Sequence, residues 1–172
     1  VGYANGITEA ELREGTVGIA DASFAGCAGL IRLSIPESVK HIGDYAFSNC
    51  TALESIRYDA RELQHIFSDN NYVFYDAGKN GRGIEVVFGA CVEVVPARIF
   101  SPVRSYSVDY SAHMPKIVSV VFEEGSVCET ISHSAFEGCI YLQSIQLPDS
   151  VTSIGGSAFR GCIGLTSLHI PE

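Results

Sequence analysis

SVKHIGDYAFSNC, residues 38–50, and SVTSIGGSAFRGC, residues 150–162, are two copies of one pattern. Each copy ends in a cysteine and is followed three residues later by a leucine. The same Phe-x-x-Cys-x-x-Leu spacing occurs 23 residues before each of them, starting at Phe24 and at Phe136. Four units with matched spacing indicate a repeat protein in which each unit forms one structural turn.

Two further units are interrupted by insertions. One, from Val92 to Phe100, repeats the apolar spacing of Val39 to Phe47. The other begins at Leu63 and Ile66, resumes at Val73-Phe74, and carries Ala77 at the cysteine position. Residues 1–172 are therefore predicted to form one domain of six rungs, a rung being one turn of the repeat. We place the rungs at about residues 12–36, 37–58, 59–89, 90–122, 123–148 and 149–172, with insertions at 67–83 and 101–115.

Each rung contains two predicted strands. The first corresponds to Leu30–Ile35, where apolar and polar side chains alternate before Pro36, as in a half-buried strand. The second corresponds to Val39–Ile42 and ends at Gly43. The segment from Ala46 to Cys50 is too short for an independent helix, and we expect a short helical or 3₁₀ bend there.

One rung cannot bury its apolar face alone, whereas stacked rungs bury a continuous core. The phenylalanine at the repeated position should therefore lie over its counterparts and form one aromatic column. The predicted column consists of Phe24, Phe47, Phe74, Phe100, Phe136 and Phe159.

The unit LPDSVTSIGGSAFRGC, residues 147–162, resembles the BspA-type leucine-rich repeat of bacterial cell surfaces and some parasitic protists. The resemblance extends from Thr16 onward and weakens in the third and fourth rungs, where insertions replace the Gly-Cys turn. It implies a leucine-rich-repeat solenoid: a right-handed, curved, β-rich superhelix of about six rungs with a parallel sheet on its concave face. It also implies an extracellular or cell-surface location, with signal and anchor outside this chain, and adherence to host proteins or other cells.

Composition and charge exclude several classes of protein. Hydrophobic residues make up 47% and charged residues 18%, which is unlike a disordered tail or a charged coiled coil. The net charge of −9 opposes a phosphate backbone, so we expect no nucleic-acid partner. No apolar run approaches the roughly 18 residues of a membrane helix, and the chain as given is expected to be soluble.

The cysteines and histidines predict no cofactor and no metal site. Equivalent cysteines in stacked rungs point the same way, leaving their Cβ atoms about 5 Å apart, further than a disulfide prefers. We therefore expect buried free thiols at the repeated position, which is occupied by Cys27, Cys50, Cys139 and Cys162. The five histidines have no metal-ligand spacing, and no catalytic triad, carboxylate pair or nucleophile elbow occurs, so we predict no enzyme.

The outward positions of the first strands are candidate ligand-binding residues, because solenoids usually bind partners through an extended concave face. They form two columns, Arg32, Ser55, Glu85, Ser119, Ser144, Ser167 and Ser34, Arg57, Val87, Val121, Gln146, His169. Most of these side chains are small and polar, with an apolar patch at Val87 and Val121. The alternative is an ordinary solvated sheet face.

The second candidate site is the insertion at residues 101–114. It carries Arg104, Tyr106 and Tyr110 among serines, and Tyr, Ser and Arg are the residues that adaptable binding loops favour. The alternative is a tolerated loop that covers the core at an irregular rung.

Two functions remain open from the sequence. The first is an extracellular recognition module that binds a protein or a glycan on another cell or host matrix. The second is a structural spacer or display repeat within a larger surface protein. The chain stops at Ile170-Pro171-Glu172, where a further rung would begin, and we expect that such an end could pair with another copy.

Overall fold

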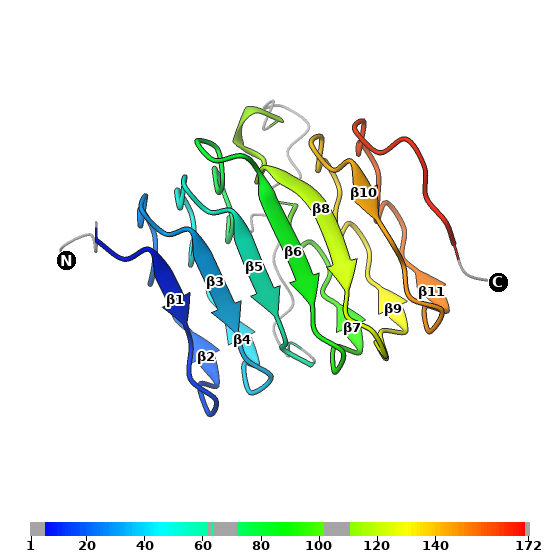
Figure 1. The fold of residues 1–172 in the computed structure, drawn as a ribbon, viewed down its shortest axis with the longest axis horizontal. Helices are drawn as coiled ribbons and strands as arrows, with labels where there is room; N and C mark the ends of the chain where they lie inside the picture. Colours follow the sequence, from blue (N-terminus) through cyan, green and yellow to red (C-terminus); the bar gives the residue numbers. More distant parts are fainter. Residues whose placement is uncertain (1–5, 62, 64–71, 102–110, 171–172) are drawn as a thin grey trace.

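The computed structural model describes residues 6–61, 63, 72–101 and 111–170 (Figure 1). One six-stranded sheet runs along the whole body, and every strand in it is parallel to its neighbours. The strands follow chain order and are β1 (Glu9–Glu11), β3 (Arg32–Ile35), β5 (Ser55–Tyr58), β6 (Ile84–Phe88), β8 (Ile117–Phe122) and β10 (Ser144–Ile145). The first five predicted rungs each add one strand to this sheet, and β1 precedes them. This stacking confirms the predicted solenoid of about six rungs.

Second strands from five rungs pair in two smaller parallel sheets. One contains β2 (Gly18–Ile19) and β4 (His41–Ile42), and the other contains β7 (Val94–Val95), β9 (Thr130–Ile131) and β11 (Ser153–Ile154). These strands are shorter than predicted, because Val39 still donates to Pro36 O in a turn and Gly43 begins the next turn. The rung between the two sheets includes Ile66, which lies outside the described residues.

The segment predicted as a short helical or 3₁₀ bend is a series of turns, in which Ser48 N–H donates to Tyr45 O and Cys50 N–H to Phe47 O. These turns do not join into a continuous helix. Tyr45 and Asn49 have φ angles of 59° and 57°, and a left-handed residue every few positions interrupts a right-handed helix. The backbone N–H of Phe47 instead donates across the rungs to Val73 O, at 2.9 Å. The only helix among the described residues is the 3₁₀ helix η1 (Ser111–His113), and three residues cannot cross a bilayer.

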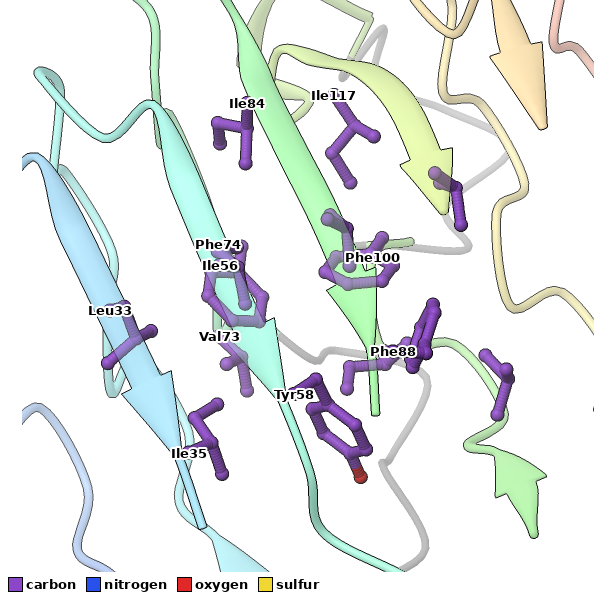
Figure 2. Packing of buried hydrophobic residues seen from close by; sticks show 14 of the residues in the cluster. Leu33, Ile35, Ile56, Tyr58, Val73, Phe74, Ile84, Phe88, Phe100 and Ile117 are labelled. Atoms are coloured by element: carbon purple, nitrogen blue, oxygen red, sulfur yellow. The ribbon is translucent and has the colours of Figure 1, made fainter. Parts of the chain in front are cut away.

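The core confirms the predicted aromatic column. Successive phenylalanine rings, from Phe24 to Phe159, lie with centroids 5.3, 5.4, 5.4, 5.6 and 5.5 Å apart. Figure 2 shows two of them, Phe74 and Phe100, among the inward side chains of the six-stranded sheet. The four central rings are buried, whereas Phe24 and Phe159 at the two ends are partly buried.

Candidate functional site

The strand register places the predicted surface residues in two adjacent columns. Arg32 pairs with Ser55, and the column continues through Glu85 and Ser119 to Ser144. The second column follows the same strands through Ser34, Arg57, Val87 and Val121, and exposed Gln146 comes directly after β10. We call this surface the six-strand face. The pairing confirms that these residues are neighbours, while ligand binding by them stays a prediction.

The first strand of the six-strand face was not predicted. β1 adds Glu9 beside Arg32 and Glu11 beside Ser34, so both columns begin with a carboxylate. A signal for this strand exists, because Ile7, Ala10 and Leu12 stand 23 residues before Leu30, Leu33 and Ile35. Alanine at the central inward position and a glutamate on either side obscured the apolar pattern.

The last members of the two predicted columns are not in the sheet. Ser167 and His169 lie in a segment without strand structure, and β10 pairs with β8 on one side. A strand forms only where a neighbour completes its ladder of hydrogen bonds, and β10 itself has only two residues. The prediction of a strand at residues 165–170 was therefore wrong for this structure.

Arg32 forms a bidentate ion pair with Glu9. Its Nε and Nη2 donate to the two carboxylate oxygens at 3.1 and 2.9 Å. These hydrogen bonds lower the pKa of Glu9. Both side chains remain more than half exposed, and solvent-exposed ion pairs contribute little to folding. The main effect of the pair is to hold the guanidinium in one orientation.

Arg57 bridges two separate parts of the six-strand face. Its Nε donates to Asp59 Oδ2 at 2.7 Å, and its two Nη atoms donate to Glu123, which follows β8. Glu123 also accepts from the backbone N–H of Ala90 at 3.3 Å, and the bonds from Arg57 lower the pKa of Glu123. Burial has the opposite effect on Asp59 and raises its pKa despite the neighbouring arginine.

The N-terminal half of the six-strand face is hollowed. One cavity of about 250 Å³ lies over β1, β3 and β5 and is lined by Glu9, Arg32 and Ser55, among others. A second of about 560 Å³ continues toward the strand ends and includes Asp59. Both share Glu11, Ser34 and Arg57, so together they form one shallow hollow with fixed charges of both signs.

The predicted loop site cannot be placed, since Arg104, Tyr106 and Tyr110 lie outside the described residues. The described end of that insertion contacts the other insertion. The ring of His113 stacks on Tyr75 at 4.7 Å, and its Nδ1 lies 3.1 Å from Asp76 Oδ2.

All six cysteines are free thiols, and the repeated ones serve packing. Cys50 Sγ donates to Phe24 O at 3.3 Å, and Cys162 Sγ donates to Phe136 O at 3.1 Å, each linking one rung to the previous one. Burial raises the pKa of Cys50 to about 12 and that of Cys162 to about 11. Within the described ranges, no group of three or more His, Cys, Asp or Glu side chains is arranged to hold a metal ion.

Comparison with solved structures finds bacterial repeat proteins of the same kind. A leucine-rich repeat protein from Eubacterium ventriosum is 26% identical over 88% of this chain, with a TM-score of 0.57. A leucine rich cell surface protein from Faecalibacterium prausnitzii is 23% identical over 88%, with a TM-score of 0.47. The chain spans 35% of the length of each of these two proteins. No curated protein matches it.

The family comparison agrees with the repeat and the fold. A family model described as a BspA type leucine rich repeat region with six copies matches residues 3–125 and 112–172. These ranges cover nearly all of the sequence, including the rungs interrupted by insertions. The parallel six-stranded sheet and the phenylalanine column are the structure that such repeats require. The chain therefore belongs to the BspA-type leucine-rich repeat family.

Proposed function

We propose that this chain is an extracellular recognition module that binds a protein through the six-strand face and carries out no catalysis. The observation that carries the proposal is the shallow hollow over β1, β3 and β5, where Arg32 and Arg57 are held in place by carboxylates. Family membership supports an interaction role and a location outside the cell.

A protein ligand fits this surface better than a small molecule. The hollow is broad and shallow, and it presents Glu9, Glu11 and Asp59 next to Arg32 and Arg57. Alternating charges of this kind select a partner with the complementary pattern, and they act on specificity and association rate more than on affinity. The exposed Val121 adds an apolar contact at the other end of the same face.

The test uses two arginines that are matched in exposure and pairing. Arg32 and Arg160 are each 60% exposed, and each pairs with a glutamate of the preceding rung. The chain is screened against purified host matrix proteins by surface plasmon resonance. We expect Arg32→Ala and the steric block Ser34→Trp each to weaken a ligand at least about tenfold, which is roughly 1.4 kcal/mol. Arg160→Ala, away from the hollow, should leave the affinity unchanged.

Three results would contradict the proposal. Equal loss from Arg32→Ala and Arg160→Ala would show that the hollow is not the site. A glycan that binds at the hollow, in place of any protein, would change the class of ligand. If no ligand binds at the six-strand face at all, the spacer function, in which the rungs hold another domain away from a surface, becomes the better explanation.

A further inference from the structure

A ladder of aromatic rings lies on the turns of the solenoid, outside the six-strand face. Tyr45 stacks on Tyr72 with ring centroids 4.7 Å apart and an interplanar angle of 11°. Tyr72 meets Tyr75 edge-on at 5.6 Å, and Tyr75 stacks on His113 at 4.7 Å. The ladder therefore runs from an ordinary rung to the described end of the second insertion.

Tyr45 is the exposed end of this ladder. Its ring is stacked against Tyr72 on the side of the following rung, and the residue is 45% exposed. The equivalent position of the preceding rung, two residues before the column phenylalanine, is Ala22, which is small and exposed. Because the backbone N–H of Ala22 donates to Asp44 O at 2.9 Å, the two rungs are in contact there. The second face of the Tyr45 ring thus lies over a small side chain and is open to solvent.

The position of Tyr45 in its turn carries different side chains in different rungs. Tyr45 has a φ of 59°, a left-handed conformation that is unfavourable for a bulky side chain. Four other rungs adopt the same conformation at the equivalent position, at Ala22, Arg98, Ser134 and Ser157, so the conformation belongs to the turn of the repeat. What distinguishes Tyr45 is its large aromatic ring, which remains half-exposed.

Two carboxylates lie in the same two turns as Ala22 and Tyr45. Asp21, directly before Ala22, is exposed, and its Oδ1 accepts from the Asp44 backbone N–H at 3.0 Å. Asp44 adds a second, partly exposed carboxylate next to Tyr45 in the chain. A half-exposed aromatic ring with carboxylates in the adjoining turns suits a sugar ring, which has an apolar C–H face and hydroxyl donors around its rim.

We propose that Tyr45, with Asp21 and Asp44, binds one ring of an uncharged oligosaccharide. Tyr72 holds the Tyr45 ring in place from behind, and Ala22 leaves the space that the sugar occupies. An acidic sugar is disfavoured, because both nearby charged groups are carboxylates and the whole chain carries a net charge of −9. This site lies on the turns and is independent of the proposed protein-binding hollow.

The experiment measures binding of defined oligosaccharides by isothermal titration calorimetry. The probes are neutral oligosaccharides of glucose, mannose, galactose and N-acetylglucosamine, with oligogalacturonate as the acidic counterpart. Tyr45→Ala removes the platform. Ala22→Arg keeps the platform but covers its open face, with the residue that the fourth rung carries at this position, Arg98. The control is Tyr141→Ala, since Tyr141 is 42% exposed and lies outside the ladder.

We expect at least one neutral oligosaccharide to bind, and both Tyr45→Ala and Ala22→Arg to weaken it at least about tenfold. Tyr141→Ala should bind like the parent, and oligogalacturonate should not bind. Thermal unfolding of each variant shows whether it is folded. If Tyr45→Ala does not fold, the affinity of Ala22→Arg for the oligosaccharide tests the proposal by itself. The proposal is overturned if no neutral oligosaccharide binds, if only the acidic one does, or if covering Tyr45 leaves the affinity unchanged. Arg32 lies outside this site. The effect of Arg32→Ala on protein binding therefore tests the proposed function and not the oligosaccharide site.

Discussion

Phe47 lies at the centre of the aromatic column, fully buried between the rings of Phe24 and Phe74. We expect Phe47→Ala to lower the free energy of unfolding by about 3–5 kcal/mol, because it removes buried area and leaves a cavity. Urea denaturation followed by circular dichroism measures this change. Phe159→Ala is the matched comparison, since Phe159 has the same repeat position but is only partly buried, and its loss should be smaller. Equal losses, or none at Phe47, would contradict a continuous core.

Tyr58 presents the opposite case, a polar group that the core does not satisfy. The side chain is fully buried and meets Phe88 edge-on at 5.4 Å, yet its hydroxyl has no hydrogen-bond partner among the described residues. Tyr58→Phe should therefore raise the free energy of unfolding by about 1 kcal/mol, since an unsatisfied buried donor is costly. Urea denaturation at neutral pH checks this, and a less stable variant would mean that the hydroxyl is satisfied.

These two residues show what the sequence can and cannot predict at this scale. Phe47 was predicted to be in the core because a fixed spacing recurs and each copy must have the same environment. The unsatisfied hydroxyl of Tyr58 depends on the shape of the surrounding core, which no local pattern encodes. The contact between Arg57 and Glu123 joins residues far apart in the chain. Predicting it would need the register of the strands between them, and the insertions hide that register.

At the scale of the element, the turns between strands depend on close approach of neighbouring rungs. A Cβ atom on Gly43 would overlap Oδ1 and the backbone N of Asp21 in the preceding rung. We expect Gly43→Ala to destabilise the protein by about 1–3 kcal/mol, because the two rungs would have to separate. Gly156→Ala is the control, since a Cβ there meets nothing within 4 Å. Thermal unfolding of the two variants should give a clear loss for the first and little change for the second.

The buried thiols that donate hydrogen bonds between rungs predict that stability depends on pH. Burial raises the pKa of Cys50 to about 12 from an ordinary value of 9.0, because the folded state disfavours the thiolate. The contribution of this group is thus fully present below pH 9 and is lost as the pH rises from 9 toward 12. Cys50→Ala should be less stable than the parent at neutral pH, and its stability should fall less steeply over that range. Denaturation curves at several pH values measure the two slopes, and parallel slopes would contradict this assignment.

The elements differ from their predicted form for a physical reason. Alternation predicted the first strand of the first five rungs, and β3 occupies four of the six expected residues. The segment Ala46–Cys50 was expected to form a short helical or 3₁₀ bend, and left-handed residues at Tyr45 and Asn49 divide it into separate turns whose N–H groups reach the next rung. These hydrogen bonds between rungs outweigh local helix formation. The sequence of a single rung does not predict them, because their acceptors lie in the next rung.

At the scale of the whole molecule, stability is a sum of contacts between neighbouring rungs. This explains why the fold could be predicted from spacing while the ligand could not. The repeat specifies the inward side chains, which must match from rung to rung. The outward side chains, such as Arg32, Ser55 and Glu85, differ freely, and their recognition properties depend on which of them the stacking brings together.

The last rung leaves apolar surface uncovered in this chain, and we expect chains of residues 1–172 to associate there. Leu165 and Leu168 are only partly buried, whereas their counterparts Leu142 and Ile145 in the preceding rung are buried. Ile163 beside them is 81% exposed. An exposed group of apolar side chains favours contact with another surface. Sedimentation velocity at rising protein concentration should show association in the parent and a loss of it in Ile163→Glu. Val17→Glu, at an exposed valine in the first rung, is the control that should still associate. A parent that stays monomeric, or a control that behaves like Ile163→Glu, would show that this end does not drive self-association.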